Sequence, residues 1–281
     1  MDDLRKTFKL VLPKYWKWKK MLWEKMTSPE IKDAASKGLI AILPVGSIEI
    51  HGPHMPVGTD SITIYKISEL AAEKEPAVVL PPFYYAYVPE NRHFPGTISL
   101  TAKTLLSLLE EVCDEISRNG FKKILVVNGH GGNNELIRVF LRDSLTKKKN
   151  YFIYALVNPW PPNLVSVIEK LTEGRTIGHA CEVETSIGLY LFEDLIKIKN
   201  VEREAKTGST NLPKGIETPV DWQAYALQLY LGDPRLASKE KGKLLVDELV
   251  TFIAEAIRKI KEDENVPGIL SNFYERAYKS I

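Results

Sequence analysis

LIAILPVGSIEIHGPHMPVGTD, residues 39–60, joins an apolar run to a polar loop and decides the architecture. Its apolar start, 39–45, has the length and composition of a strand that is buried on both faces. The loop that follows carries two acidic residues and two histidines among glycines and prolines, Glu49, His51, His54 and Asp60. In an open α/β sheet, ligands bind just beyond the carboxyl ends of the strands. These side chains are therefore expected at the functional edge of a sheet.

The same unit recurs at 122–133, where an apolar run leads into NGHGGN. We expect strands at 39–45, 77–83, 122–129 and 151–158. We expect helices at 61–74, 101–119, 133–147, about 181–197 and about 236–262, with Thr101 as the cap of the second. Strands rich in Val, Ile and Leu that alternate with helices predict an α/β fold whose mostly parallel central sheet is covered on both faces.

Some segments fit this alternation less well. Residues 199–230 show no clear periodicity and carry Gly, Pro and polar residues, so we expect an excursion that serves as a lid or an interface loop. Residues 1–27 are basic and rich in Trp, and we expect them to pack on the body or on another subunit, with a membrane-surface or nucleic-acid arm as the alternative. A short tail is expected after Pro267. No break in composition divides the chain, which is interpreted as a single domain, 1–281.

The composition is that of a globular protein, 44% hydrophobic and 26% charged. With 38 basic and 36 acidic residues, the chain has no overall basic field, which argues against nucleic acid as its main partner. No apolar run has the length of a membrane span or of a signal-peptide core. Cys113 and Cys181 do not make a disulfide framework and suit a reducing compartment. We therefore expect a cytoplasmic protein without a membrane partner.

The five histidines lie close to glycine or proline rather than inside apolar runs: His51, His54, His93, His130 and His179. Glycine lets a chain fold closely around a ligand or an ion. If the strands 39–45 and 122–129 are neighbours, four side chains converge in one pocket: Glu49, His51, Asp60 and His130. Mixed imidazole and carboxylate ligands suit Zn, Mn or Fe. Taken singly, each of the four also has a structural explanation, since Asp60 could cap a helix and the others could lie in surface loops.

GHACEVETS, residues 178–186, forms a third polar cluster. His179, Glu182 and Glu184 gather at an expected helix start, where the helix dipole alone favours acidic side chains. Cys181 also suggests a Cys–His nucleophile, but no spacing positions that pair, and lone cysteines are usually packed.

Five motifs in series resemble the creatininase family of metal-dependent amidohydrolases. They are GSIEIHGPHMPVGTD (46–60), FPGTISL (94–100), NGHGGN (128–133), HACEVETS (179–186) and GDPRLASKEKG (232–242). The resemblance covers about residues 40–250. It implies a three-layer α/β/α sandwich, two divalent metal ions per chain (Zn, Mn or Fe) and a homo-oligomer, often a hexamer.

The resemblance also implies roles for particular residues. Glu49 and His130 would bind one metal ion, His51 would bind the other, and Asp60 would bridge the two. His179 would be the catalytic histidine.

Two positions depart from the family pattern. Creatininase itself has a further glutamate ligand where this chain has Gly132, which argues against creatininase activity proper and leaves one metal ion short of a protein ligand. Glu184 is expected to fill that gap, as a ligand or as an acid/base group. Relatives often carry a histidine where this chain has Asn91.

The implied chemistry is hydrolysis of a C–N bond by a hydroxide held between two cations. His179 or Glu184 would donate the proton that the leaving nitrogen needs. Substrate contacts are expected from the glycine-rich loops and one tyrosine: His54, Gly131, Gly132, Asn133 and Tyr87.

Several functions stay open at this point. A formamide hydrolase acting on a ribosylaminopyrimidine phosphate is the leading candidate if the source is archaeal, with Arg92 or Arg175 near the phosphate. Creatininase proper and a peptide-cleaving family member are the alternatives for this small-molecule amide or formamide site. A non-catalytic, metal-stabilised binding protein is a competing class, and a phosphate-binding flavodoxin-like protein is a third. An NTPase is not expected because NGHGGN lacks the P-loop lysine.

Overall fold

The computed structural model describes residues 21–158, 160–174 and 176–279. Trp16 and Trp18 of the basic N-terminal segment lie outside these residues. Trp23, which belongs to the same segment, packs on the body, with its ring centroid 5.3 Å from that of Phe121.

Four parallel strands form the central sheet, in the order β2-β1-β3-β4. Their bounds are β1 Ala41–Val45, β2 Val78–Val79, β3 Lys123–Asn128 and β4 Phe152–Leu156. All four were predicted from their apolar runs, and so was their parallel arrangement. β2 is shorter than the predicted 77–83, because Pro81 and Pro82 have no N–H group to donate to the neighbouring strand.

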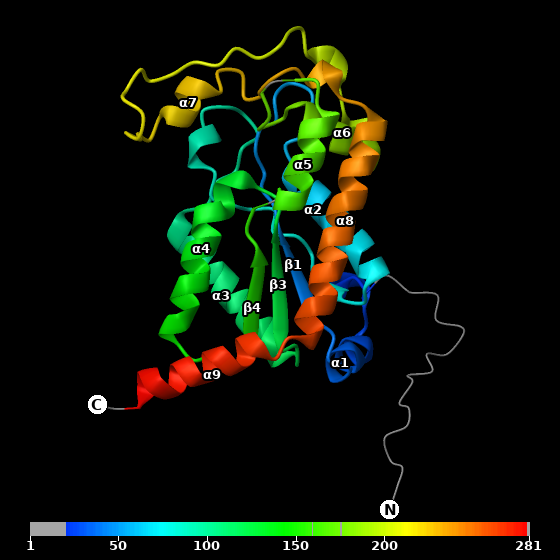
Figure 1. The fold of residues 1–281 in the computed structure, drawn as a ribbon, viewed down its shortest axis with the longest axis vertical. Coiled ribbons are helices and arrows are strands. Elements are labelled where there is room, and N and C mark those ends of the chain that lie inside the picture. The colour runs from blue at the N-terminus through cyan, green and yellow to red at the C-terminus, as the bar shows by residue number, and fades with distance from the viewer. Residues whose placement is uncertain (1–20, 159, 175, 280–281) are drawn as a thin grey trace, which may run out of the picture.

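Helices cover both faces of the sheet, which makes the predicted three-layer α/β/α sandwich (Figure 1). One face is covered by α2 Thr59–Lys74, α5 Pro162–Leu171, α6 Glu182–Leu191 and α8 Lys239–Glu262. The other face is covered by α1 Ser28–Ser36, α3 Ala102–Arg118 and α4 Asn134–Asp143. The remaining helices are α7 Asp221–Tyr225 and α9 Asn265–Tyr278, which lie beyond opposite ends of the strands in Figure 1.

Local sequence explains where the helices begin and which face they bury. The Thr101 hydroxyl accepts a hydrogen bond from Thr104 N at 3.2 Å and caps α3, as predicted. In α8, buried residues recur at helical spacing, among them Leu245, Leu249 and Ile253. Each such side chain stabilises the fold by about 1.5–3 kcal/mol when it is fully buried. α8 thereby fixes α2 and α6, the helices that carry two of the acidic site residues.

Four helices outside the 199–230 excursion differ from the predictions, and α5 at Pro162–Leu171 was not predicted. α9 forms where only a short tail was expected, because Pro267 lies in the first turn, where its missing N–H costs no hydrogen bond. The helix predicted at 181–197 ends at Leu191 and gives way to short turns. α1 was not predicted, although Thr27 and Glu30 form a capping box at its start.

The excursion at 199–230 is largely irregular, as expected, apart from α7. In Figure 1 it lies above the carboxyl ends of the strands. None of the described helices combines the length and the apolar character that a membrane span requires.

Candidate metal centre

Four of the predicted site residues meet at the carboxyl ends of β1 and β3. Glu49 and His51 follow β1, His130 follows β3, and Asp60 lies in the first turn of α2. The β1 loop is closed by a backbone hydrogen bond from Glu49 N to Val57 O, at 2.8 Å. Gly46 allows the close approach of α2, since a Cβ there would lie 2.4 Å from Ser61. The alternative reading of Asp60 as a helix cap is wrong, because α2 begins at Thr59 with Gly58 as its N-cap.

A first group of ligand atoms consists of Glu49, Asp60 and His130. His130 Nδ1 lies 2.7 Å from Glu49 Oε1 and 2.9 Å from Asp60 Oδ2. The His130 loop is fixed by Asn128, whose amide donates to His130 O at 2.8 Å and accepts from His130 N at 3.1 Å. All three ligand side chains are buried.

A second group consists of His51, Asp60 and Glu184. His51 Nε2 lies 3.0 Å from Asp60 Oδ1 and 3.8 Å from Glu184 Oε2. The other imidazole nitrogen, Nδ1, lies 3.1 Å from the carbonyl oxygen of Glu49, which fixes the plane of the ring. Asp60 therefore directs one carboxylate oxygen to each group.

The donor set fits divalent cations better than it fits an internal hydrogen-bond network. His130 Nδ1 has at most one N–H for the two carboxylate oxygens beside it. Asp60 Oδ2 also accepts a hydrogen bond from the Ser47 hydroxyl at 2.7 Å, but Glu49 Oε1 has no partner of hydrogen-bond geometry in the described chain. Buried polar atoms without partners are rare in folded proteins and call for an explanation such as an ion. Imidazole and carboxylate ligands are those that Zn and Mn accept.

The electrostatics of the metal-free cluster point the same way. Burial opposes a charged imidazole, but Asp60 outweighs it and raises the pKa of His51 to about 10. Burial is likewise outweighed at His130, whose pKa is raised well above its usual value by Glu49 and Asp60. The acidic side chain that the two groups share shifts in the opposite direction. Burial would raise the pKa of Asp60, but the charges of His51 and His130 hold it well below its usual range. The cluster thus binds positive charge strongly, as protons when no cation is present.

His179 lies over the same cluster. Its Nε2 lies 2.7 Å from the carbonyl oxygen of Ile50, and its Nδ1 lies 3.9 Å from Glu49 Oε1. Its ring centroid is 4.3 Å from that of His51. Burial, together with the charge of His51, lowers the pKa of His179 to about 4, so this imidazole is neutral near pH 7. A neutral ring that donates from Nε2 leaves Nδ1 free to accept a proton on the side of the cluster.

Glu184 reaches the cluster from the first turn of α6. Its Oε2 accepts a hydrogen bond from Ala180 N at 2.6 Å. The Ala180 backbone has a φ of 48°, an uncommon conformation for a residue with a side chain. Burial raises the pKa of Glu184 to about 7, although His51 opposes the shift. A carboxyl group with this pKa can both hold and release a proton near neutral pH.

Other predicted residues lie around the cluster rather than in it. His54 is buried, and its Nε2 lies 2.9 Å from the Thr185 hydroxyl. The Asn133 amide donates to Gly46 O at 3.1 Å and so ties the β3 loop to the β1 loop. Tyr87 is 36% exposed, Gly131 faces open space and Arg92 is exposed. Arg175 lies outside the described residues.

The third sequence cluster is divided by the structure. Glu182 faces away from the site, where it accepts hydrogen bonds from Glu173 N and Gly174 N and pairs with Lys241 at 2.7 Å. Cys181 is buried at the α6 N-cap, and burial raises the pKa of its thiol to about 11. A thiol with this pKa is a poor nucleophile, which argues against a Cys–His pair at this position.

Gly132 lies directly beside His130. A Cβ at this position would lie 2.4 Å from His130 Nε2 and 3.2 Å from Glu90 Oε1. His130 Nε2 is buried and has no hydrogen-bond partner among the described residues. The absence of a side chain at Gly132 therefore permits the close approach of this loop to the imidazole ring, and the Glu90 carboxylate lies nearby.

Trp222 is a neighbour of the cluster that the sequence did not reveal. Its indole N–H donates to Asn91 Oδ1 at 2.7 Å, and Asn91 Nδ2 donates to Glu49 Oε2 at 2.5 Å. Asn91 was identified only as a departure from the family pattern. Trp222 lies in a segment without periodicity, so only the tertiary fold brings it here.

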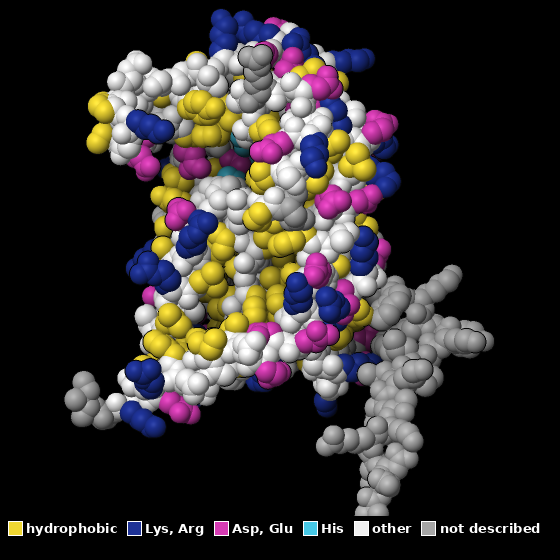
Figure 2. All heavy atoms as spheres, viewed as in Figure 1, with side chains coloured by type: hydrophobic (Ala, Val, Ile, Leu, Met, Phe, Trp, Pro, Cys, Tyr) yellow, Lys and Arg dark blue, Asp and Glu magenta, His cyan; other side chains and the backbone are white. Residues whose placement is uncertain are grey.

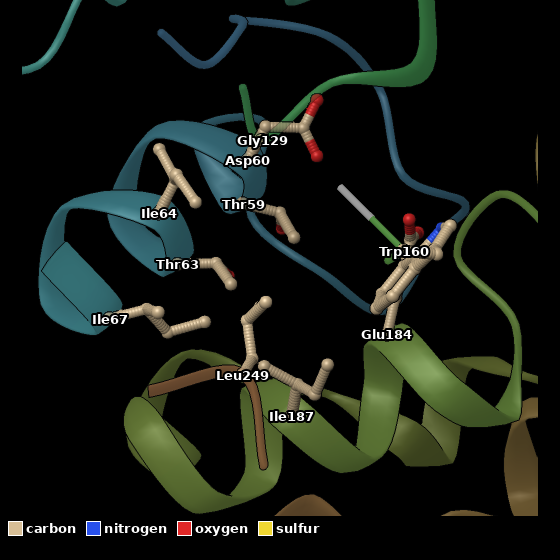
Figure 3. Close-up of a pocket in the computed structure, with 10 residues that line it drawn as sticks. All are labelled: Thr59, Asp60, Thr63, Ile64, Ile67, Gly129, Trp160, Glu184, Ile187 and Leu249. Carbon is tan, nitrogen blue, oxygen red and sulfur yellow. The ribbon is translucent and has the colours of Figure 1, made fainter. Parts of the chain in front are cut away.

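A small cavity of about 30 Å³ adjoins the two acids Asp60 and Glu184. Figure 3 shows both carboxylates and Trp160 on one side and apolar side chains of α2, α6 and α8 on the other, namely Ile64, Ile67, Ile187 and Leu249. On the surface, Figure 2 shows histidine and acidic side chains at the base of a recess. A cavity of this volume has room for about one water molecule.

This fold and site define a class of protein: a three-layer α/β/α sandwich with a buried carboxylate–imidazole cluster at the carboxyl end of its parallel sheet. The sequence matches the family model of creatininase, creatinine amidohydrolase, over residues 24–257. The chain belongs to the creatininase family, and the resemblance inferred from the five motifs is confirmed.

Two curated relatives illustrate the range of this family. Creatinine amidohydrolase of Pseudomonas putida is 29% identical over 238 residues, which cover 80% of this chain and 90% of the relative. The 2-amino-5-formylamino-6-ribosylaminopyrimidin-4(3H)-one 5'-monophosphate deformylase of Methanosphaera stadtmanae is 28% identical over 229 residues, covering 75% and 88%. Solved structures of a manganese creatininase and of a Zn–Zn creatininase variant each superpose with a TM-score of 0.73 at 28% identity, over 86% of this chain and 98% of theirs.

Proposed function

We propose that the protein is a metal-dependent amidohydrolase that cleaves a C–N bond of a small amide or formamide with two divalent cations. The observation that carries this proposal is the placement of Asp60, whose two carboxylate oxygens face two separate groups of ligand atoms. A carboxylate in this position is what a pair of bridged cations requires.

Glu49, Asp60 and His130 would hold one cation, and His51, Asp60 and Glu184 would hold the other. The manganese and Zn–Zn forms of the related creatininases support Mn or Zn as the metals. When bound, such a pair of cations supplies Lewis acidity to the scissile carbonyl and lowers the pKa of a water molecule toward about 7.

His179 would transfer the proton that the leaving nitrogen needs. The carbonyl of Ile50 holds its Nε2, so that Nδ1 faces the cluster as an acceptor. Because the low pKa keeps the ring neutral, it can take a proton from the attacking water and deliver it to the nitrogen. Glu184 has two alternative roles: as a cation ligand it would fill the gap left by Gly132, and as a free carboxyl group its pKa of about 7 would let it exchange a proton near neutral pH.

Within this chemistry, a formamide is the favoured substrate class. Gly132 removes the additional glutamate expected of creatininase proper, and the close approach of its backbone to His130 leaves no space for that side chain in the present loop conformation. A deformylase is among the relatives that align over most of the chain. The recess at the surface, with histidine and acidic side chains at its base, suits a small molecule.

The test is a panel of cyclic amides, N-formyl compounds and short peptides, assayed with protein reconstituted in Mn²⁺ or Zn²⁺. We expect two cations per chain and hydrolysis that a chelator abolishes, with the N-formyl compounds turned over fastest. Asp247→Asn, an exposed acid on α8, serves as the matched control and should leave activity unchanged. Metal that raises only the melting temperature, without hydrolysis of any compound, would identify a non-catalytic metal-stabilised protein instead.

A further inference from the structure

Glu49 is held in place by a hydrogen-bond chain that begins in the excursion at 199–230. Trp222 Nε1 donates to Asn91 Oδ1 at 2.7 Å, and Asn91 Nδ2 donates to Glu49 Oε2 at 2.5 Å. Asn91 is only 1% exposed, and its amide can satisfy both partners in one orientation only. The indole N–H, a donor only, therefore determines which end of the Asn91 amide faces Glu49.

The Trp222–Asn91–Glu49 hydrogen bonds determine which oxygen of the Glu49 carboxylate remains available to bind a cation. Oε2 is used by Asn91, whereas Oε1 faces His130 Nδ1 at 2.7 Å and has no partner of hydrogen-bond geometry in the described chain. Without Asn91, the carboxylate would be free to rotate about its last torsion, which is soft. Binding a cation would then have to order the Glu49 carboxylate, which costs free energy. In the native arrangement the carboxylate is already ordered when the protein folds.

Trp222 is fixed by a second contact of the same helix. Gln223 donates from Nε2 to the carbonyl oxygen of Glu90 at 2.8 Å, so α7 is attached at two adjacent points to the turn that carries Asn91. The Trp222 ring also meets the His179 ring edge-on, with centroids 5.6 Å apart. One residue of the excursion thus contacts both the support of Glu49 and the histidine over the cluster.

The other group of ligand atoms has different supports. His51 is oriented by the carbonyl of Glu49, and Glu184 by Ala180 N. Neither contact involves α7 or Asn91. Loss of the Trp222–Asn91 chain should therefore act on one group of ligands and spare the other.

We propose that Asn91 and Trp222 are positioning residues that orient Glu49, so that docking of the 199–230 excursion strengthens cation binding at the Glu49–Asp60–His130 group. This inference rests on the proposed role of Glu49 as a metal ligand. Partners of this kind, which orient a metal ligand, typically change metal affinity by 10–100-fold when they are removed. By linkage, a cation bound at this group should in turn stabilise the docked α7.

The experiment is competition of Zn²⁺ between a chromophoric chelator and the full-length protein. In Asn91→Ala, we expect one of the two zinc equivalents to weaken by roughly 10–100-fold and the other to change by less than about threefold. Trp222→Phe keeps a ring but removes the N–H, and should weaken the same equivalent by roughly three- to tenfold, as befits one hydrogen bond. Tyr225→Phe, on the same short helix, is the control and should leave both equivalents unchanged.

A second variant separates the hydrogen bond from simple docking of α7. Gln223→Ala removes the contact to Glu90 O and leaves the Trp222 N–H in place, so its effect should be smaller than that of Trp222→Phe. Equal effects would overturn the assignment to the indole N–H. Hydrogen exchange gives an independent readout: zinc should slow exchange in 221–226 of the wild-type protein, and less so in Trp222→Phe.

The outcomes distinguish this inference from the proposed function. If wild-type protein binds two zinc ions and Asn91→Ala binds both as tightly, or loses both to the same degree, the positioning role is wrong while the metal centre stands. If the wild-type protein binds no zinc at this cluster, the proposed function fails and the inference fails with it. Melting temperatures of the metal-free variants exclude a general loss of folding, and Trp222→Phe remains informative if Asn91→Ala does not fold.

Discussion

The two ends of the parallel sheet treat charge in opposite ways. At the amino end, charged groups near the surface already have opposite charges beside them. Lys149, for example, lies 2.8 Å from Asp114 and 2.9 Å from Glu110, and the Tyr151 hydroxyl donates to Asp114 at 2.7 Å. At the carboxyl end, Glu49, Asp60, His51 and His130 are buried, and their ligand atoms face one another with too few protons to satisfy them. The amino end pairs its charges with one another, whereas the carboxyl end gathers ligand atoms in groups that could hold a metal ion.

The largest effect is expected from a substitution at the carboxyl end of the sheet, at the residue that both groups of ligand atoms share. Asp60→Ala removes both oxygens that the two groups of ligands share, so the protein should lose both cations. Because bound cations stabilise the transition state by several kcal/mol, metal-dependent hydrolysis should fall by at least about 10³-fold. Metal analysis of the purified variant, alongside a kinetic assay, checks both parts. Near-normal activity would remove Asp60 from the mechanism.

The next largest effect separates binding of cations from transfer of protons. His179→Gln keeps a hydrogen-bonding side chain but cannot carry a proton, and His179 is not needed for either group that contains Asp60. We expect kcat to fall by about 10²-fold or more with two cations still bound. The decisive measurement is kcat and metal content on the same preparation. Loss of a cation together with activity would instead make His179 a ligand, as the third group of Glu49, His51 and His179 would allow.

Removing the metal should lower the melting temperature of the protein, and this tests whether the carboxyl end of the sheet binds cations. At a free cation concentration of about 100 times Kd, a bound ion contributes about 2.7 kcal/mol, which for a chain of this size is a decrease of roughly 5–10 °C in melting temperature when it is removed. Calorimetry before and after dialysis against a chelator measures this difference. Asp114→Asn, at the amino end, should show the same decrease as the wild-type protein. If the melting temperature of both proteins stayed the same after dialysis, cation binding would be contradicted.

The smallest expected effect lies at the amino end itself. Burial opposes ionisation of Asp114, but its hydrogen bonds with Lys149 and Tyr151 hold its pKa below the usual value. Such a carboxylate stabilises the folded state above the pKa of the unfolded chain, and this contribution is lost as the pH falls. Because Asp114 is partly exposed, Asp114→Asn should cost less than about 1 kcal/mol at neutral pH and a smaller amount near about pH 3. Urea unfolding of both proteins at the two pH values provides the measurement, and activity should not change.

Much of the architecture was visible in the sequence because its signals are local. Apolar runs before Glu49 and His130 predicted β1 and β3, and parallel strands bring whatever follows them to one edge. The same logic found Asp60, which begins the helix after the β1 loop. Its alternative role as a helix cap could be rejected only with the helix start in view.

The remaining features depend on contacts between distant segments. Trp222 reaches Asn91 across more than a hundred residues, and no periodicity in 199–230 marks it. Glu182 and Glu184 look alike in sequence, but two positions on a helix point to different sides, so one pairs with Lys241 and the other joins the cluster. α9 was missed because Pro267 was interpreted as a stop rather than as a first-turn residue. The expected homo-oligomer and the single domain stay predictions.

The missing side chain at Gly132 also bears on how this lineage can change. With the present backbone, even a methyl group at position 132 would come within 2.4 Å of His130 Nε2, a ring that the cluster holds on its other side. A glutamate at this position would therefore require His130 or the 128–133 loop to shift. This chain and the glutamate-bearing relatives should accordingly differ in the path of that loop, and not only in one side chain.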